Sequence, residues 1–271
     1  MHHILAQVAA EFESLEANLR QSFRVLAQGR PRGDVTELEG VSIASLGAAF
    51  QMFNAAFLNQ PVATRDELEA RIICAAALFQ ERRLPWAFWI CEDWLTRSVR
   101  RILVATCREF GLQIAAEMPG MLAESLRVPK RAMPPLNIVR ASDDTAMEDF
   151  RTIGSACFHV PPAWFREVFD DWMPWREFAC WVAYRGETPV ATAATVVSGG
   201  VIGLYNVATM PQERGNGYAE AIIRHAIATA SRDSGLQRVI LQSTASGERL
   251  YKRLGFREVS RLVVFNSSGA D

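Results

Sequence analysis

Residues 212–221 read QERGNGYAEA and lie between a run with strand composition, VIGLYNVAT (201–209), and a run with helix periodicity. The apolar positions of the second run recur three and four residues apart and form one face: Ala219, Ile222, Ile223, Ala226, Ile227 and Ala230. A strand that passes through glycines into a helix arranges unpaired backbone N–H groups around a small concavity, at the positive end of the helix dipole. Gly215 and Gly217 let the backbone approach a ligand closely, and Arg214 adds a cation. The stretch therefore predicts a phosphate site.

The spacing of this loop excludes two common nucleotide-binding loops. A dinucleotide fingerprint, GxGxxG, needs a small residue at position 220, where Glu220 stands. A P-loop needs a Gly-Lys-Ser/Thr ending, which the stretch lacks. Taken alone, RGNG is also typical of a surface turn that caps a helix.

The segments around the loop predict a mixed α/β domain. Three strand-like runs at 178–184, 189–197 and 201–209 are joined by two short turn-forming connectors, which indicates an antiparallel meander. The other elements expected in this half are a strand at 136–141, helices at 145–157 and 161–171, the helix after the loop, a strand at 238–243, a helix at 247–255 and a strand at 256–265.

The first half shows a similar order of elements. We expect helices at 4–28, from Thr64 to Pro85 and at 95–110, and strands at 86–90 and 112–117. A helix, a strand, a second helix, a glycine and a strand follow one another in both halves. This order predicts that the N-terminal half is a diverged copy of the C-terminal fold.

A proline-rich segment separates the two halves. Residues 127–136 hold three prolines and three basic residues with little to bury, which is typical of a short, stiff linker. The sequence therefore predicts an N-terminal α/β domain at 1–126, a linker at 127–135 and a second domain at 136–271.

The second half resembles the GNAT superfamily of N-acetyltransferases. The stretch NVATMPQERGNGYAEAII is similar to the acyl-CoA pyrophosphate motif of that family, with Gln212, Gly215 and Gly217 in its three defined positions. Further on, LYKRLGF (250–256) is similar to the second signature of the family, Leu-Tyr-x-x-x-Gly-Phe. The resemblance covers about residues 136–266 and implies a GNAT-like fold that uses acetyl-CoA as a co-substrate. It also implies direct transfer of the acetyl group to an acceptor amine.

The resemblance implies roles for individual residues. The strand before the loop binds the acetyl carbonyl and the pantetheine arm in this family, which maps onto Val207, Ala208 and Thr209 as an oxyanion hole and clamp. Tyr251 occupies the position of the general acid that protonates the departing sulfur, although the same pattern is also typical of a packed aromatic residue. The residues expected at the cofactor are Val207, Ala208, Thr209, Gln212, Arg214, Gly215, Asn216, Gly217, Tyr218, Ala219 and Thr244.

The general base is less well defined. His159 lies where the family has its acceptor loop, and a histidine titrates near neutral pH. A lone histidine is more often structural or exposed, so a water chain is an alternative. The other acidic candidates are Glu213, Asp170, Asp171 and Glu177.

Two positions depart from the family pattern. Thr244 and Gly247 stand where many members carry an asparagine and an alanine that contact the pantetheine arm. Thr244 can still donate a hydrogen bond. Its role stays open at this point.

The first half lacks both signatures. At the place of the phosphate loop it reads ATRDEL (63–68), which has two acids that would repel a diphosphate, and Cys107 stands at the place of Tyr251. We therefore expect the N-terminal domain not to bind CoA. The tryptophans Trp164, Trp172 and Trp175 are either core residues or the lining of an apolar acceptor pocket.

The composition limits the remaining classes of function. Among 271 residues, 29 basic side chains nearly balance 30 acidic ones, so no overall field attracts nucleic acid or an anionic membrane. Five scattered cysteines without a CxxC pair indicate neither a disulfide framework nor a metal site, and the cytoplasm is the expected location. The sequence thus predicts a cytoplasmic N-acetyltransferase that is a monomer or a homodimer. The alternative is a CoA-binding regulatory or scaffold protein without transfer activity.

Overall fold

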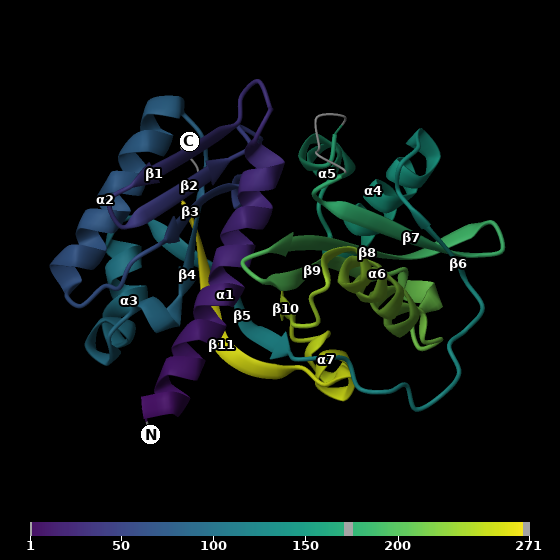
Figure 1. Cartoon of the computed structure of the whole chain (residues 1–271). Coiled ribbons are helices and arrows are strands. Elements are labelled where there is room, and N and C mark those ends of the chain that lie inside the picture. Colours follow the sequence, from purple (N-terminus) through teal and green to yellow (C-terminus); the bar gives the residue numbers. More distant parts are fainter. Residues whose placement is uncertain (1, 171–175, 268–271) are drawn as a thin grey trace. The chain divides into compact units, whose positions relative to one another are not determined.

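The computed structural model describes residues 2–170 and 176–267, which fold into two compact units (Figure 1). Unit 1 consists of residues 1–22 and 121–258, and unit 2 consists of residues 23–120 and 259–271. This division differs from the expected boundary at 127–135, because each end of the chain belongs to the unit that the other half mainly forms. The first residues fold with the second half, and the last strand folds with the first half.

Unit 1 is built on a mixed sheet with the strand order β5-β10-β9-β8-β7-β6. The strands are the end of β5 (Leu112–Ala123), β6 (Asn137–Arg140), β7 (Ala179–Arg185), β8 (Thr188–Ser198), β9 (Val201–Thr209) and β10 (Val239–Gln242). The helices are α4 (Asp144–Phe158), α5 (Pro162–Val168), α6 (Tyr218–Ser234) and α7 (Glu248–Leu254). Strands β7, β8 and β9 pair in antiparallel order, which confirms the predicted meander, and β10 runs parallel to β9.

Helix α6 buries the apolar face that its sequence predicts. Ile222, Ile223 and Ala226 are completely buried and share the core of unit 1 with residues of β8 and β9. The helix begins after Gly217 and ends before Gly235, and both glycines have a left-handed backbone with φ of +85° and +75°. Glycine takes up this conformation at little cost, so the two residues fix the ends of the helix.

The first part of helix α1 (His2–Ala27) belongs to unit 1, where Asn18 anchors it. This side chain is completely buried and donates to the carbonyl oxygens of Val196 and Ser198 at 3.1 and 3.0 Å. Its Oδ1 accepts from the hydroxyl of Tyr205 at 2.6 Å. One amide thus links α1 to the backbone of the β8–β9 hairpin and to Tyr205.

Unit 2 repeats much of this arrangement, with the strand order β1-β2-β3-β4-β11-β5. Its strands are β1 (Asp34–Leu38), β2 (Val41–Ser45), β3 (Asn54–Leu58), β4 (Ala87–Cys91), most of β5 and most of β11 (Arg257–Ser267). Its helices are the end of α1, α2 (Arg65–Arg82) and α3 (Arg97–Glu109), with short 3₁₀ turns η1 (Gln51–Phe53) and η2 (Glu92–Trp94). The meander β1-β2-β3 was not predicted from the sequence.

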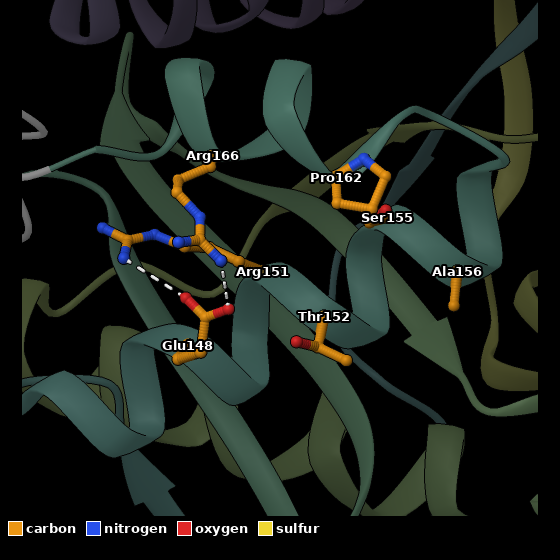
Figure 2. Close-up of a pocket in the computed structure, with 7 residues that line it drawn as sticks. All are labelled: Glu148, Arg151, Thr152, Ser155, Ala156, Pro162 and Arg166. Atoms are coloured by element: carbon orange, nitrogen blue, oxygen red, sulfur yellow. Dashed lines mark hydrogen bonds and ion pairs between the residues drawn. The ribbon is translucent and has the colours of Figure 1, made fainter.

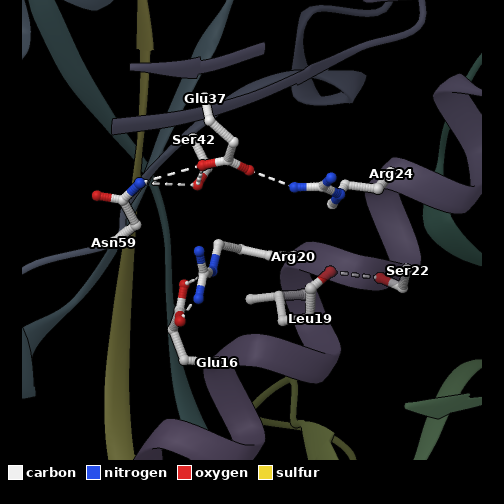
Figure 3. Close-up of polar contacts among 8 residues, drawn as sticks. All are labelled: Glu16, Leu19, Arg20, Ser22, Arg24, Glu37, Ser42 and Asn59. Carbon is white, nitrogen blue, oxygen red and sulfur yellow. Dashed lines mark hydrogen bonds and ion pairs between the residues drawn. The ribbon is translucent and has the colours of Figure 1, made fainter. Parts of the chain in front are cut away.

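A carboxylate ties the first strands of unit 2 to the end of α1. Glu37 on β1 accepts hydrogen bonds from Arg24, Ser42 and Asn59 (Figure 3). The three donors come from α1, β2 and the end of β3. The contact therefore holds the first hairpin of unit 2 against the helix.

The structure confirms that the two halves share one order of elements. In each, an antiparallel meander leads into a helix, a strand, a second helix, a glycine and a long strand. These are α2, β4, α3, Gly111 and β5 in the first half and α6, β10, α7, Gly255 and β11 in the second. Strand β11 pairs antiparallel with β4, so the last strand of the second copy lies in the sheet of unit 2.

Candidate active site

The central parallel strands of unit 1, β9 and β10, separate toward their carboxyl ends. They pair only at Val239↔Ile202 and Ile240↔Gly203. Strand β9 continues to Thr209 and stays paired with β8 on its other edge. In the described part of the chain, no parallel strand takes up the backbone groups of β9 at 204–209, so this edge is open to a ligand that binds like a strand.

A β-bulge bends β9 just before its end. The register with β8 shifts between Thr192 and Ala194, so that Asn206 and Val207 both lie opposite Ala193. Asn206 has a left-handed backbone with φ of +48°, a conformation that asparagine tolerates better than most residues. The Thr192 hydroxyl donates to its carbonyl at 2.9 Å and fixes the bulge. Nothing in the sequence alone had indicated this irregularity.

The loop after β9 presents free backbone donors at the start of α6. A 3₁₀ turn, η3 (Pro211–Glu213), is followed by Gly215 and Gly217, whose φ angles are +86° and +85°. The amides of residues 215–219 donate no hydrogen bond to any described residue, and no side chain caps the helix. Nothing lies within 4 Å of the position that a Cβ of Gly215 would take. The loop therefore fits an anionic group such as a diphosphate.

Three polar residues of the loop lie on its exposed rim. Gln212, Arg214 and Asn216 are all exposed. Arg214 Nε donates to the Thr209 carbonyl at 3.3 Å, and Asn216 Nδ2 donates to the Glu213 carbonyl at 3.1 Å. These two bonds brace the loop while leaving its amides free.

The remaining residues expected on β9 and α6 differ in exposure. Ala208 and Tyr218 are buried in unit 1, so Ala208 can offer a ligand only its backbone. Val207 and Ala219 are half-buried. All four belong to the segment that runs from the open edge of β9 to the first turn of α6.

Tyr251 lies on α7 with its ring in the core of unit 1. Its side chain is 8% exposed and meets the ring of Phe256 edge to face, with 5.7 Å between the centroids. Burial raises the pKa of Tyr251 above its ordinary value, which keeps the phenol protonated. The hydroxyl has no hydrogen-bond partner among the residues that the structure describes.

The departure at position 247 has a steric reason. A Cβ at Gly247 would come within 2.9 Å of Cε2 of Tyr251, so an alanine would displace the ring. Thr244 is exposed, its hydroxyl lies 3.0 Å from that of Ser246, and its carbonyl accepts from the amide of Gly247 at 3.0 Å. Thr244 thus starts the turn that leads into α7.

His159 ends helix α4 and is exposed. It has a left-handed backbone with φ of +56°, and its amide donates to the Ser155 carbonyl. Its imidazole has no hydrogen-bond partner within the described ranges. The geometry accounts for His159 as a helix terminator, and the contacts do not link it to the phosphate loop.

Sequence reasoning missed Cys157, which joins α4 to the end of β9. Its Sγ donates to the Thr209 carbonyl at 3.4 Å, the same oxygen that Arg214 contacts. Burial raises the pKa of the Cys157 thiol, and the nearby Arg214 guanidinium opposes this effect. A scattered cysteine carries no spacing signal, so only the fold could reveal the contact.

A separate pocket of about 250 Å³ lies between α4 and α5 (Figure 2). Its carboxylate, Glu148, is held between Arg166 at 2.6 Å and Arg151 at 3.7 Å. The one carboxylate of this pocket is thus already shared by its two arginines. Trp164 on α5 is 40% exposed, whereas Trp172 and Trp175 lie outside the described residues.

At the equivalent positions of unit 2, side chains cap the first turn of the helix. At the start of α2, the Glu67 amide donates to Thr64 Oγ1 at 3.2 Å, and the Ala63 amide donates to the Glu67 carboxylate at 2.6 Å. This capping box uses the donors that α6 leaves free. Cys107, which matches Tyr251, is completely buried, and burial raises its pKa to about 12.

The described residues hold neither a metal-binding cluster nor a membrane-spanning helix. No cluster of three histidine, cysteine or acidic side chains could hold a metal ion there. Within the same ranges, none of the helices combines the length and the apolar character that crossing a membrane requires.

Comparisons with known proteins agree with this geometry. Residues 146–256 match the model of the acetyltransferase (GNAT) family. No curated protein matches the chain in sequence.

Several solved structures share the fold across both units. A GCN5-related N-acetyltransferase from Kribbella flavida is 17% identical with a TM-score of 0.71, and the match covers 94% of this chain and 96% of that one. A GCN5-related N-acetyltransferase from Sphaerobacter thermophilus is 14% identical with a TM-score of 0.60, over 86% and 78% of the two chains. A tandem GNAT protein from the clavulanic acid biosynthesis pathway is 10% identical with a TM-score of 0.58, over 97% and 95%.

Proposed function

We propose that this chain moves an acetyl group from acetyl-CoA directly to an acceptor amine, since residues 146–256 match the model of the acetyltransferase (GNAT) family. The observation that carries the proposal is the pairing of β9 and β10. Their separation leaves the edge of β9 open beside a loop with free amides. A strand-like pantetheine arm and a diphosphate need these two surfaces side by side.

The donor would bind through backbone groups first. The amides of 215–219 would hold the diphosphate, since they lack other partners and lie at the positive end of α6. Gln212, Arg214 and Asn216 line the rim of the same loop. The open edge of β9 would then clamp the pantetheine arm.

The acetyl carbonyl would lie at the bend of β9. Backbone donors at Val207, Ala208 and Thr209 would stabilise the negative charge that develops on its oxygen. The bulge at Asn206 bends β9 just before these residues, which supports the assignment.

Tyr251 would act as the general acid. The amine nitrogen attacks the thioester carbon, the C–S bond breaks, and the departing sulfur takes the phenolic proton. Burial keeps the phenol of Tyr251 in the protonated form that an acid requires, although the raised pKa also makes it a weaker proton donor. The proton of the amine would leave through His159 or through water.

The test is to measure CoA release with a panel of amines for the wild type and for Tyr251→Phe. We expect kcat to fall by about a hundredfold, while KM for acetyl-CoA changes little, since only transition-state stabilisation is removed. Tyr184→Phe is a matched control, because that hydroxyl bonds to Asp149 at 2.6 Å instead.

Two results would contradict the proposal. An unchanged kcat in Tyr251→Phe would remove the acid from the mechanism. Acetyl-CoA binding by calorimetry without turnover on any amine would instead favour a CoA-binding regulator.

A further inference from the structure

The proline-rich segment 127–135 is part of unit 1 and forms a strap between α7 and α6. The Arg127 amide donates to the Leu254 carbonyl at the end of α7, at 2.9 Å. Farther along, Arg131 Nη2 and Pro134 Cδ lie 2.9 and 3.7 Å from the position of a Cβ at Gly217. Figure 1 shows this segment passing α7 on its way to β6. The strap therefore runs from the second signature helix to the phosphate loop.

A groove of about 370 Å³ lies under this strap. Its lining comes from three elements, the strap, α6 and α7: Val128, Lys130, Arg131, Glu220, Arg224 and Arg253. It holds four basic side chains and a single carboxylate. The groove is therefore a candidate site for a ligand with several negative charges.

The carboxylate of the groove does not neutralise the basic side chains of the strap. Glu220 is 6% exposed and accepts from Arg224 Nε and Nη2 at 3.0 and 2.8 Å, while Arg253 lies 3.7 Å away. Its negative charge is thus paired with the two helix arginines. The side chains of Lys130 and Arg131 make no hydrogen bond or ion pair with any described residue.

The position of Arg131 is electrostatically unfavourable without an anion. Its guanidinium lies over Gly217, at the positive end of the α6 dipole, where a negative charge is normally stabilising. The unpaired amides of 215–219 belong to the same loop. An anion between the guanidinium and the helix would turn a repulsion into two attractions.

We propose that the strap is a third wall of the donor site, in which Arg131 binds the diphosphate of CoA and Lys130 binds its 3′-phosphate. This inference rests on the proposed use of acetyl-CoA. The diphosphate belongs to Arg131 because that side chain lies at the phosphate loop. The 3′-phosphate is assigned to the groove because CoA carries this phosphate on the far side of the diphosphate from the pantetheine arm.

Calorimetric titration with CoA and with dephospho-CoA tests the assignment. Compared with the wild type, Arg131→Ala should weaken both ligands about tenfold, the effect of one charge-assisted contact. Lys130→Ala should weaken CoA by about fivefold to tenfold and leave dephospho-CoA unchanged. Arg101→Ala, which removes an exposed charge on α3 of unit 2, is the control for net charge and should bind both ligands like the wild type.

The outcomes separate the strap from the proposed function. Wild-type affinity in both strap variants would overturn the inference while leaving acetyl-CoA as the donor. An equal loss for CoA and dephospho-CoA in Lys130→Ala would overturn the assignment of the 3′-phosphate. Failure of the wild type itself to bind either ligand would overturn both the inference and the proposed function.

Discussion

Gly217 meets two demands that no other residue can meet together. Its φ of +85° lies in the left-handed region, and a Cβ there would come within 2.9 Å of the Arg131 guanidinium. The first demand concerns the backbone conformation, and the second concerns the space that the Arg131 guanidinium occupies. The two can be separated experimentally.

We predict that Gly217→Ala weakens acetyl-CoA binding by about tenfold or more, because the methyl group displaces Arg131 from the phosphate loop. Gly200→Ala is the matched control, since Gly200 also has a positive φ, of +73°, but no atom lies within 4 Å of its Cβ position. Both variants should lose about 1–2 kcal/mol of unfolding free energy from backbone strain. Only Gly217→Ala should lose affinity in calorimetry.

Wild-type affinity in both glycine variants would contradict a contact between the donor and the loop at Gly217. A loss of affinity in both variants would point to a general loss of structure. Melting curves recorded on the same samples distinguish these cases.

At the scale of elements, α1 and the β8–β9 hairpin depend on one side chain. Asn18→Ala should lower the unfolding free energy by about 2–4 kcal/mol, since it removes buried hydrogen bonds to the hairpin carbonyls and to the Tyr205 hydroxyl and leaves a space in the core. Urea unfolding measures the change. Gln237→Ala, an exposed amide on the surface of unit 1, should cost less than about 0.5 kcal/mol.

A small effect of Asn18→Ala would mean that water replaces the amide in the hairpin. In that case α1 would be held by its apolar face and by its other polar contacts, such as the ion pair of Glu11 with Arg257 at 2.6 Å. The comparison with Gln237→Ala at equal denaturant slope decides between the two explanations.

The elements differ in how far the sequence predicts them. Helix α6 could be predicted to within a turn, because its apolar face recurs at helical spacing between two glycines. The strands at 34–58 could not, because runs such as VSIAS and NAAFL are short and rich in small residues. Their periodicity is too brief to distinguish strand from loop.

The candidate site was predictable only where it rests on local pattern. The glycines of the loop follow from their spacing between a strand and a helix, and Tyr251 follows from the resemblance of LYKRLGF to a family signature. Asn206, Cys157 and Arg131 do not, because their roles arise from a strand bulge, a helix end and a strap that meet only after folding.

At the scale of the whole molecule, the last strand, β11, contributes to the sheet and the core of unit 2. Val263 and Phe265 of β11 belong to the core of unit 2, at 3% and 0% exposure, and β11 lies between β4 and β5. The prediction of separate domains at 1–126 and 136–271 would assign this strand to the other half. A strand does not encode which of two similar sheets it joins, so pattern alone misses the exchange.

We predict that a chain ending at Glu258 fails to fold unit 2. Removing β11 leaves the edge of β4 unpaired and opens the core beneath it. Amide hydrogen exchange should show loss of protection at 87–91. A chain ending at Ser267 keeps the whole of β11 and serves as the control.

Persistent protection of 87–91 in the shorter chain would show that the sheet of unit 2 closes without β11. The exchange of strands would then be incidental to stability. Loss of protection in the control chain as well would point to the final residues instead.

The crossing of the two ends also sets an order of events during synthesis. The segment 23–120 is translated early, yet β11, which completes its sheet, is translated only after residues 121–256. Unit 1, in turn, needs the first residues of the chain and residues translated much later. Neither unit can finish folding before the segment around β11 has been translated, so β4 stays open to aggregation until then.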